Sequence, residues 1–282
     1  MKQLLRARRG NLCDSLSADE AALLHSFGEA GAAVLQPPRR AEHLLNDDEF
    51  ILTLRYRLLI DDPAGASGTP CANVRQGTGV PCGEVSSRKH AKHALDCPVG
   101  WGPTIRHDFR RDALAAWLEE HHGASTVKME QRIPQWDKDT NEGTQLAVLD
   151  VVFSPAGGRV AVDISVVNVL ASSDVEARAR ARAGGVAARE RERQKHRRYP
   201  GPGLVAAALE TGGRFGRELT AFLKEHAPSD VAIRPLALAD VRQRLGAALA
   251  RGNAAMLLRS AGAAQRPWPT RGQLSVANRG SP

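Results

Sequence analysis

Two aspartates are spaced so that a β-hairpin would bring them together. In the segment LDVVFSPAGGRVAVDIS (residues 149–165), Asp150 and Asp163 stand in two β-branched, apolar runs separated by a Pro-Ala-Gly-Gly turn. Because strand side chains alternate in direction, this four-residue turn places the two carboxylates opposite each other on one face. The other face would be apolar and buried, and it would carry Leu149, Val151, Phe153, Val160, Val162, Ile164 and Val166.

Adjacent carboxylates repel each other, and a divalent cation between them relieves the repulsion. Mg²⁺ is commonly held by one or two carboxylates together with water and substrate phosphate oxygens, and it can activate water for phosphodiester cleavage. The hairpin therefore predicts a Mg²⁺ or Mn²⁺ site at Asp150 and Asp163. The alternative is two surface aspartates on the solvent-exposed face of an antiparallel hairpin.

A second group of residues has the types that bind zinc. They are Cys71, Cys82, His93 and Cys97, and the intervals between them contain ten, ten and three residues. Three thiolates and one imidazole suit a closed tetrahedral Zn²⁺ site, which would be structural and coupled to folding. His90 is an alternative third ligand, and a degenerate knuckle or buried free thiols are the other interpretations. Cys13 has no partner in this pattern.

The charge of the chain favours an anionic partner. The formal net charge is +8 and the pI is about 9.8, and residues 176–199 alone carry nine arginine and lysine and three glutamate side chains. Aromatic residues make up only 4% of the chain, which argues against a surface rich in stacking rings. Few cysteines, no secretion signal and no membrane-length apolar run indicate a reducing compartment, so the chain is not expected to be secreted or to have a membrane partner.

Periodicity and capping residues predict the elements around these groups. Ser17 begins a helix, and Asn46 with Glu49 forms a capping-box pattern. Helices are expected over 105–122, 174–199, 214–226 and 238–258, and a strand over 126–133. Residues 136–145 are expected to be a polar loop, whereas 204–213 fit either a buried strand or a short apolar helix.

In order and spacing, six motifs resemble the restriction-like endonuclease region at the C-terminal end of site-specific non-LTR retrotransposon polyproteins, a branch of the PD-(D/E)XK superfamily. The motifs are LNDDEFILTLRYRLLI, HALDC, RHDFRRDALAAWL, LDVVF…VAVDISVV, QKHRRY and LETGGRFG. The resemblance covers residues 27–225. It implies that Asp150 and Asp163 are the catalytic metal ligands. The superfamily lysine falls at Ser165, and in this branch it comes from the following helix, where Lys195 matches it and Tyr199 lies on the same helical face.

The sequence departs from the family pattern at two positions, and the resemblance implies further contacts. Leu149 stands in place of the usual proline, and Val148 in place of a frequent basic residue. The CCHC knuckle would end at HALDC and help to position nucleic acid. Glu130 would be an additional acid near the metal, and Glu210 would be structural. The side chains expected to contact phosphates are Arg106, Arg111, Arg191, Arg197 and Arg198.

The predicted fold is α/β, with a small mixed or antiparallel central sheet flanked by helices, restriction-endonuclease-like, and an N-terminal helical and zinc-knuckle extension. The expected parts are a helical lead-in (1–70), the knuckle (71–99), the endonuclease core (100–235), a C-terminal helix (236–261) and a disordered tail (262–282). The resemblance implies a DNA partner, with RNA of the parent element as a second candidate, and the reverse transcriptase on a separate or missing segment. It also implies a nuclear location, or a cytoplasmic one for a decayed copy. The competing hypotheses are a catalytically inactive nucleic-acid-binding relic and an unrelated α/β protein.

Overall fold

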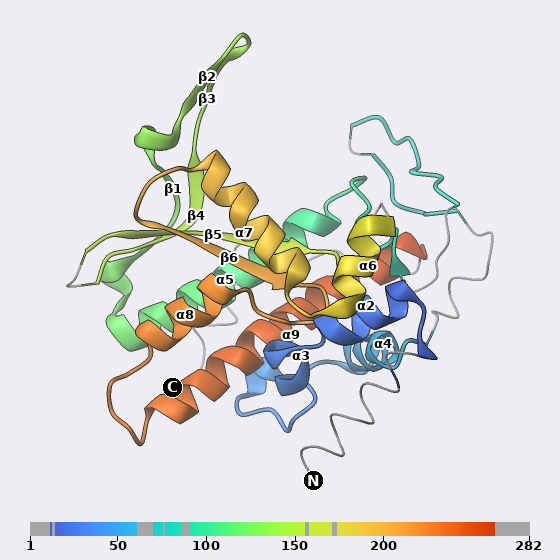
Figure 1. Cartoon of the computed structure of the whole chain (residues 1–282), viewed down its shortest axis with the longest axis horizontal. Helices are drawn as coiled ribbons and strands as arrows, with labels where there is room; N and C mark the ends of the chain where they lie inside the picture. The colour runs from blue at the N-terminus through green and yellow to red at the C-terminus, as the bar shows by residue number, and fades with distance from the viewer. Residues whose placement is uncertain are drawn as a thin grey trace.

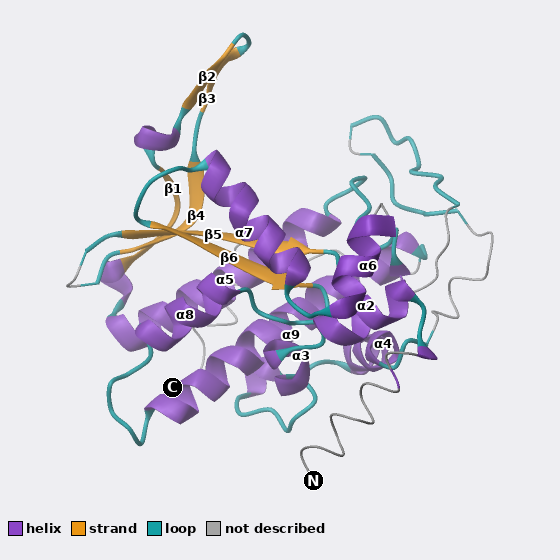
Figure 2. Cartoon of the chain, viewed as in Figure 1, coloured by secondary structure: helices purple, strands orange, loops and turns teal. Residues whose placement is uncertain are grey.

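The computed structural model describes residues 12, 15–60, 70–75, 77–85, 91–155, 158–170 and 174–262. Cys13, His90 and the predicted tail beyond Gly262 lie outside the described residues. The fold is mixed α/β, with one four-stranded mixed sheet flanked by helices, as the sequence predicts at this level (Figures 1 and 2).

The strands of the main sheet are β1 (Val127–Arg132), β4 (Val148–Phe153), β5 (Val160–Val167) and β6 (Leu204–Glu210). They lie in the order β1-β4-β5-β6. The β1–β4 and β4–β5 pairs are antiparallel, and β5–β6 is parallel. In the hairpin Val151 pairs with Val162, and extending this register by one residue places Asp150 opposite Asp163, as predicted. Residues 204–210, which periodicity could not assign, are therefore a buried strand.

The helices are α2 (Ala18–Ser26), α3 (Glu29–Ala33), α4 (Asp47–Arg57), α5 (Gly102–His122), α6 (Asp174–Arg182), α7 (Val186–Arg198), α8 (Arg217–Glu225) and α9 (Arg234–Ser260). The predicted capping box at Asn46 and Glu49 is present, and Ser17, predicted only to begin a helix, forms a second one with Glu20. In each box the side chain of the first residue accepts a hydrogen bond from the glutamate N–H, and the glutamate side chain accepts one from the backbone N–H of the first residue. Short 3₁₀ turns occur at η1 (Ala41–His43), η4 (Ala124–Thr126) and η5 (Pro134–Trp136). None of the described helices is both long and apolar enough to cross a bilayer.

Both faces of the sheet are covered. One face carries Val151, Phe153, Val162 and Ile164, which pack on α5, α8 and α9 in the main core. The other face has a second cluster, formed by Ile133, Trp136, Ala147, Leu149, Val152, Ala161 and Leu204 with Tyr199 packed against them. The alternative interpretation, two aspartates on a solvent-exposed face, is therefore excluded. Leu149, expected on the same face as Val151 and Phe153, belongs instead to the second cluster. The reason is that the connection from β5 to β6 lays α7 across this face (Figure 1).

Two local predictions are corrected. The expected helix over 174–199 is two helices, α6 and α7, because Gly185 adopts φ +78° and Gly184 approaches α2 so closely that a Cβ would lie 2.7 Å from the His25 carbonyl oxygen. The expected polar loop at 136–145 contains a β-ribbon, β2 (Lys138–Thr140) with β3 (Gly143–Gln145). Figure 1 shows this ribbon projecting away from the sheet, and its strand residues are exposed on both strands.

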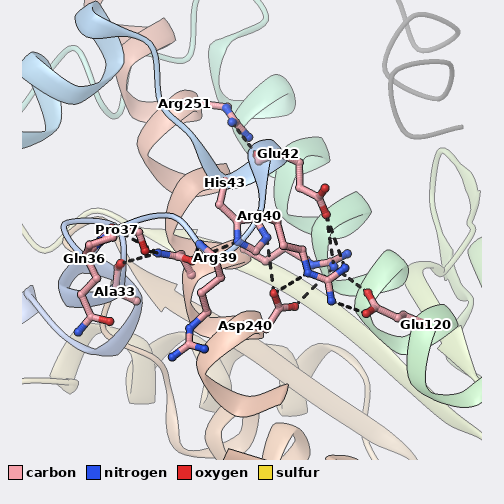
Figure 3. Close-up of polar contacts among 12 residues, drawn as sticks. Ala33, Gln36, Pro37, Arg39, Arg40, Glu42, His43, Glu120, Asp240 and Arg251 are labelled. Carbon is pink, nitrogen blue, oxygen red and sulfur yellow. Dashed lines mark hydrogen bonds and ion pairs between the residues drawn. The ribbon is translucent and has the colours of Figure 1, made fainter. Parts of the chain in front are cut away.

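The lead-in and the C-terminal helix pack into the same body as the sheet. Ala30 of α3 and Leu245 of α9 belong to the main core cluster. Arg40, on the segment before η1, forms ion pairs with Glu120 of α5 and with Asp240 of α9 (Nε–Oδ1 2.9 Å), and Arg244 also reaches Glu120 (2.8 Å; Figure 3). These charges fix the lead-in segment across the ends of two long helices.

Gly246 of α9 provides a test of this packing. A Cβ at this position would lie 2.4 Å from the Ala30 carbonyl oxygen of α3. In an unpacked helix, glycine to alanine stabilises by about 1 kcal/mol. For Gly246→Ala we expect the opposite sign, a loss of about 1–3 kcal/mol in the free energy of unfolding measured by chemical denaturation, because α3 must move away. A variant as stable as the wild type would contradict the close approach of α3 and α9.

Candidate active site and metal centre

Asp150 lies near the middle of β4, with both carboxylate oxygens engaged. Oδ1 lies 2.9 Å from Nε2 of His107, which the second turn of α5 brings to the sheet, and Oδ2 accepts a hydrogen bond from the Ile164 backbone N–H (2.5 Å). The carboxylate is half-buried. The two contacts hold it in one orientation at the edge of the covered face.

Asp163, on β5, is buried at 6% exposure and contacts a lysine of α7, the second helix after β5. Lys195 Nζ of α7 lies 2.6 Å from Asp163 Oδ2. Burial raises the pKa of the Asp163 carboxyl, the Lys195 ammonium opposes this rise, and the charge of Asp150 adds to it. A carboxylate whose ionised form is disfavoured by burial and by a second carboxylate is well suited to hold a cation. The structure therefore brings together Asp150, Asp163 and Lys195, which are three of the four predicted catalytic residues.

Glu130 of β1 stands across from Asp150 on the other side of β4. The β1–β4 register pairs Met129 with Val151 and then Gln131 with Leu149, so Glu130 is the residue opposite Asp150. Its backbone has φ +52°, an uncommon value for a residue other than glycine. Its carboxylate accepts from Arg111 Nη1 at 2.6 Å. The Glu130 backbone thus lies next to Asp150 on the neighbouring strand, and its carboxylate is ion-paired with Arg111 of α5.

The two arginines predicted on α5 do not face solvent. Arg106 is 4% exposed and donates to Asn253 of α9, and burial lowers its pKa to about 10. The Arg111 guanidinium is 3% exposed and ion-paired with three carboxylates, those of Asp108, Asp112 and Glu130. Neither guanidinium is available to a phosphate in this conformation. Instead of contacting phosphate, both arginines stabilise the fold. Arg106 lies under α9, and Arg111 is paired with three carboxylates.

The basic side chains predicted on α7 lie in different settings. Arg197 is exposed, whereas Arg191 is half-buried. Arg198 donates to Gln145 of β3 (3.0 Å) and lies 5.1 Å from the Tyr199 ring centroid. Only Arg197 of these three is fully open to an anionic partner.

Tyr199 closes the C-terminal end of α7. Its ring packs in the second cluster, 5.6 Å from the Trp136 ring, and Lys195 Nζ lies 6.0 Å from its centroid. Its backbone N–H donates to the Lys195 carbonyl (2.8 Å). The ring therefore supports the helix end that carries Lys195.

The four predicted zinc ligands converge. Their ligand atoms all lie within 4.8 Å of one another. Cys71 and Cys97 sulfurs are 3.8 Å apart, those of Cys97 and Cys82 are 3.7 Å apart, and Cys82 Sγ lies 3.5 Å from His93 Nε2. A tetrahedral ion with Zn–S of about 2.3 Å and Zn–N of about 2.1 Å sets sulfurs about 3.8 Å apart and sulfur and nitrogen about 3.6 Å apart. The cluster can hold a metal ion of this kind.

The cluster needs a cation to become a set of thiolates. Burial raises the pKa of the Cys71 thiol to about 12, and Cys97 is fully buried. Sulfurs this close and this buried would repel one another if ionised without a metal. The close approach of these donor atoms is therefore more consistent with a bound zinc ion than with three free thiols.

The metal cluster is joined to the rest of the fold at three places. The Ala72 N–H donates to the Ser260 carbonyl at the end of α9 (2.9 Å), and the Asn168 side chain, just after β5, donates to the Lys92 carbonyl (3.1 Å). Leu95, between two ligands, is fully buried against Met256 of α9. The loop is thus attached to α9 by Leu95 and by one hydrogen bond, and to the end of β5 by a second hydrogen bond.

Two features of the site were not assigned from the sequence. The sequence placed His107 on the helix beside the site but gave it no contact with Asp150. The Ser165 hydroxyl, two residues after Asp163, is buried with no hydrogen-bond partner among the described residues. The alternation of β5 places Ser165 on the face of Asp163, whereas the His107 contact depends on how α5 packs on the sheet, which no local pattern encodes.

Comparisons with known proteins assign no family. No protein-family model matches the chain, and no curated protein matches it closely enough to count as a relative.

Proposed function

We propose that this chain is a metal-dependent DNA endonuclease with a restriction-endonuclease-like fold, derived from a non-LTR retrotransposon. The observation that carries the proposal is the pairing of Asp150 and Asp163 across one hairpin, with Lys195 of α7 lying 2.6 Å from the second carboxylate. Support also comes from the excess of basic residues, since nucleic acid is a polyanion.

Asp150 and Asp163 would hold a Mg²⁺ or Mn²⁺ ion, which supplies a Lewis acid and an activated water. The residues themselves fit this task. His107 and the Ile164 N–H orient the Asp150 carboxylate, so its position is set before a cation arrives. Lys195 neutralises Asp163 without the ion, and its ammonium group can instead turn to stabilise charge on a scissile phosphate. We further propose Zn²⁺ as the ion at Cys71, Cys82, His93 and Cys97.

Plasmid nicking tests the activity. Purified zinc-loaded protein is incubated with supercoiled plasmid and Mg²⁺ or Mn²⁺, beside Asp150→Ala and Asp163→Ala. We expect nicking that requires the divalent ion and that each substitution reduces by about 10³-fold or more, because each removes a ligand worth several kcal/mol in the transition state. Equal residual nicking in all three proteins would reject the enzyme. Metal-independent DNA binding without nicking would instead favour the nucleic-acid-binding relic.

Substitutions of Tyr199 distinguish a packing role of its ring from a chemical role of its hydroxyl group. If its ring supports the end of α7, Tyr199→Phe should keep nicking within about fivefold of the wild type, a difference of about 1 kcal/mol. Tyr199→Ala should lose about 1–3 kcal/mol of unfolding free energy, because the half-buried ring packs against Trp136. Loss of nicking in a stably folded Tyr199→Phe protein would show that the hydroxyl takes part in the reaction.

A further inference from the structure

A surface groove lies directly beside the metal cluster. Its volume is about 390 Å³, and it is lined by Arg75, Pro98, Val99, Gly100 and Trp101. This volume falls within the roughly 300–1,000 Å³ typical of sites for small ligands. No role assigned above to the carboxylate pair or to the zinc ligands uses these residues.

One wall of the groove is an exposed indole. Trp101 is 48% exposed, whereas Trp117 and Trp136 are buried at 0% and 4%. Tryptophan normally buries most of its large ring area, because that area is costly to leave in water. An indole open to solvent in a groove offers a flat face on which another planar group can stack.

The lining of the groove also includes a cationic side chain. The Arg75 side chain is exposed, and within the described part of the chain it has no ion-pair partner. By contrast, Arg111 and Arg180 are each ion-paired with glutamate side chains. The pairing of a bare guanidinium with a bare indole selects a ligand that combines an anion with a planar ring.

The chain segments that carry Arg75 and Trp101 are both adjacent to the metal cluster. Arg75 lies on the turn between Cys71 and Cys82, where its N–H and carbonyl bond residues 80 and 79 across the turn (2.8 and 3.0 Å). Pro98 to Trp101 follow Cys97 directly, and Cys97 Sγ contacts the Val99 carbonyl at 3.7 Å. Metal binding would therefore tie together the two chain segments that carry the guanidinium and the indole.

We propose that this groove binds one unpaired nucleotide of a nucleic-acid strand, with its base stacked on Trp101 and its phosphate bound by Arg75. A paired base in a duplex has both faces covered by its neighbours, so stacking selects a single-stranded or flipped base. Only one exposed ring is present in the groove, so the site takes one nucleotide and does not contradict the low aromatic content of the chain.

The position of Trp101 relates this groove to the carboxylate pair. Trp101 is the N-cap of α5, and His107, the partner of Asp150, lies six residues further along this helix. Six residues of α-helix span about 9 Å, which is the length of about three stacked nucleotides of one strand. A strand bound at the candidate active site can therefore extend into the groove. The inference rests on the proposed function only in taking nucleic acid as the ligand.

Tryptophan fluorescence tests the proposal in the full-length, zinc-loaded chain without Mg²⁺. Trp101 is the one exposed indole among the described residues, and a Trp268→Phe background removes the tryptophan that lies outside them. The titrants are a ten-nucleotide single-stranded DNA, the matching RNA, and a blunt DNA duplex. We expect quenching by the single strands and little by the duplex. Trp101→Ala should remove the quenching and weaken single-strand binding roughly 5- to 150-fold, while Trp101→Phe should bind with intermediate affinity.

The Arg75→Ala variant and the comparison of DNA with RNA complete the test. Arg75→Ala should keep the stacking signal but reduce the dependence of binding on salt by about one ion. Preference for DNA over RNA, or the reverse, identifies the source of the nucleotide. Absence of quenching by both single strands, or a Trp101→Ala protein of full zinc content that binds them as tightly as the wild type, would overturn the proposal. Nicking without quenching would reject the groove alone, and quenching without nicking would reject the nuclease alone.

Discussion

Replacing Cys97 by serine is expected to remove the metal ion and to lower the free energy of unfolding by at least about 3 kcal/mol. The Cys97 sulfur is fully buried and lies within 3.8 Å of two other cysteine sulfurs, so serine leaves an incomplete ligand set in a buried place. The loss should spread beyond the loop, because Leu95 packs on Met256 and the Ala72 N–H bonds the end of α9. Metal content after purification without chelator, together with thermal unfolding, measures both effects.

Cys13 provides the matched control. Four ligands already complete a tetrahedral site, so Cys13→Ser should keep one zinc per chain and the stability of the wild type. A Cys97→Ser protein that retains full zinc stoichiometry would show that the observed cluster is not the zinc site.

Asp163→Asn should separate activity from stability. Burial raises the pKa of the Asp163 carboxyl, so the folded protein holds this proton more tightly than the unfolded chain. At neutral pH the ionised side chain therefore opposes folding, and this effect grows as the pH rises through the folded-state pKa. The amide has nearly the same shape without the charge. We expect an unfolding free energy at pH 7 within about 1 kcal/mol of the wild type or above it, with nicking lost.

The matched control is a second buried carboxyl with a raised pKa. Glu210 is 2% exposed, and it accepts a hydrogen bond from the Ala188 backbone N–H. Glu210→Gln makes the same chemical change away from Lys195 and should keep the nicking rate. If Asp163→Asn unfolds the protein, or if Glu210→Gln abolishes nicking as completely, the special role of Asp163 would be refuted.

The sequence predicted those parts of the fold that local patterns encode. Alternation along two apolar runs predicted the register that sets Asp150 opposite Asp163. Two helix starts were marked by Ser17 as an N-cap and by the capping-box pattern of Asn46 and Glu49. The spacing of cysteines and a histidine identified four residues whose ligand atoms converge. The hairpin register and the helix starts depend on strand periodicity and capping geometry, which act over a few residues. The metal cluster depends on the requirement that one ion needs four ligands.

The incorrect predictions concern packing between distant segments. Arg106 was expected on a DNA-facing surface, but α9 returns from the far end of the chain and buries it beside Asn253. Leu149 was expected in the main core, but α7 and Tyr199 cover the second face and form a cluster there. The break between α6 and α7 follows from the close approach of Gly184 to the end of α2. These outcomes depend on tertiary contacts that no local pattern records.

Binding of Mn²⁺ tests most directly whether the two carboxylates form one cation site. Zinc-loaded wild-type protein, Asp150→Asn and Asp163→Asn are titrated with Mn²⁺ while the paramagnetic resonance signal of the free ion is followed. We expect the wild type to bind Mn²⁺ in addition to its zinc, and each substitution to abolish that binding, because both carboxylates contribute to one site. Equal Mn²⁺ binding by all three proteins would contradict the proposed metal site at Asp150 and Asp163.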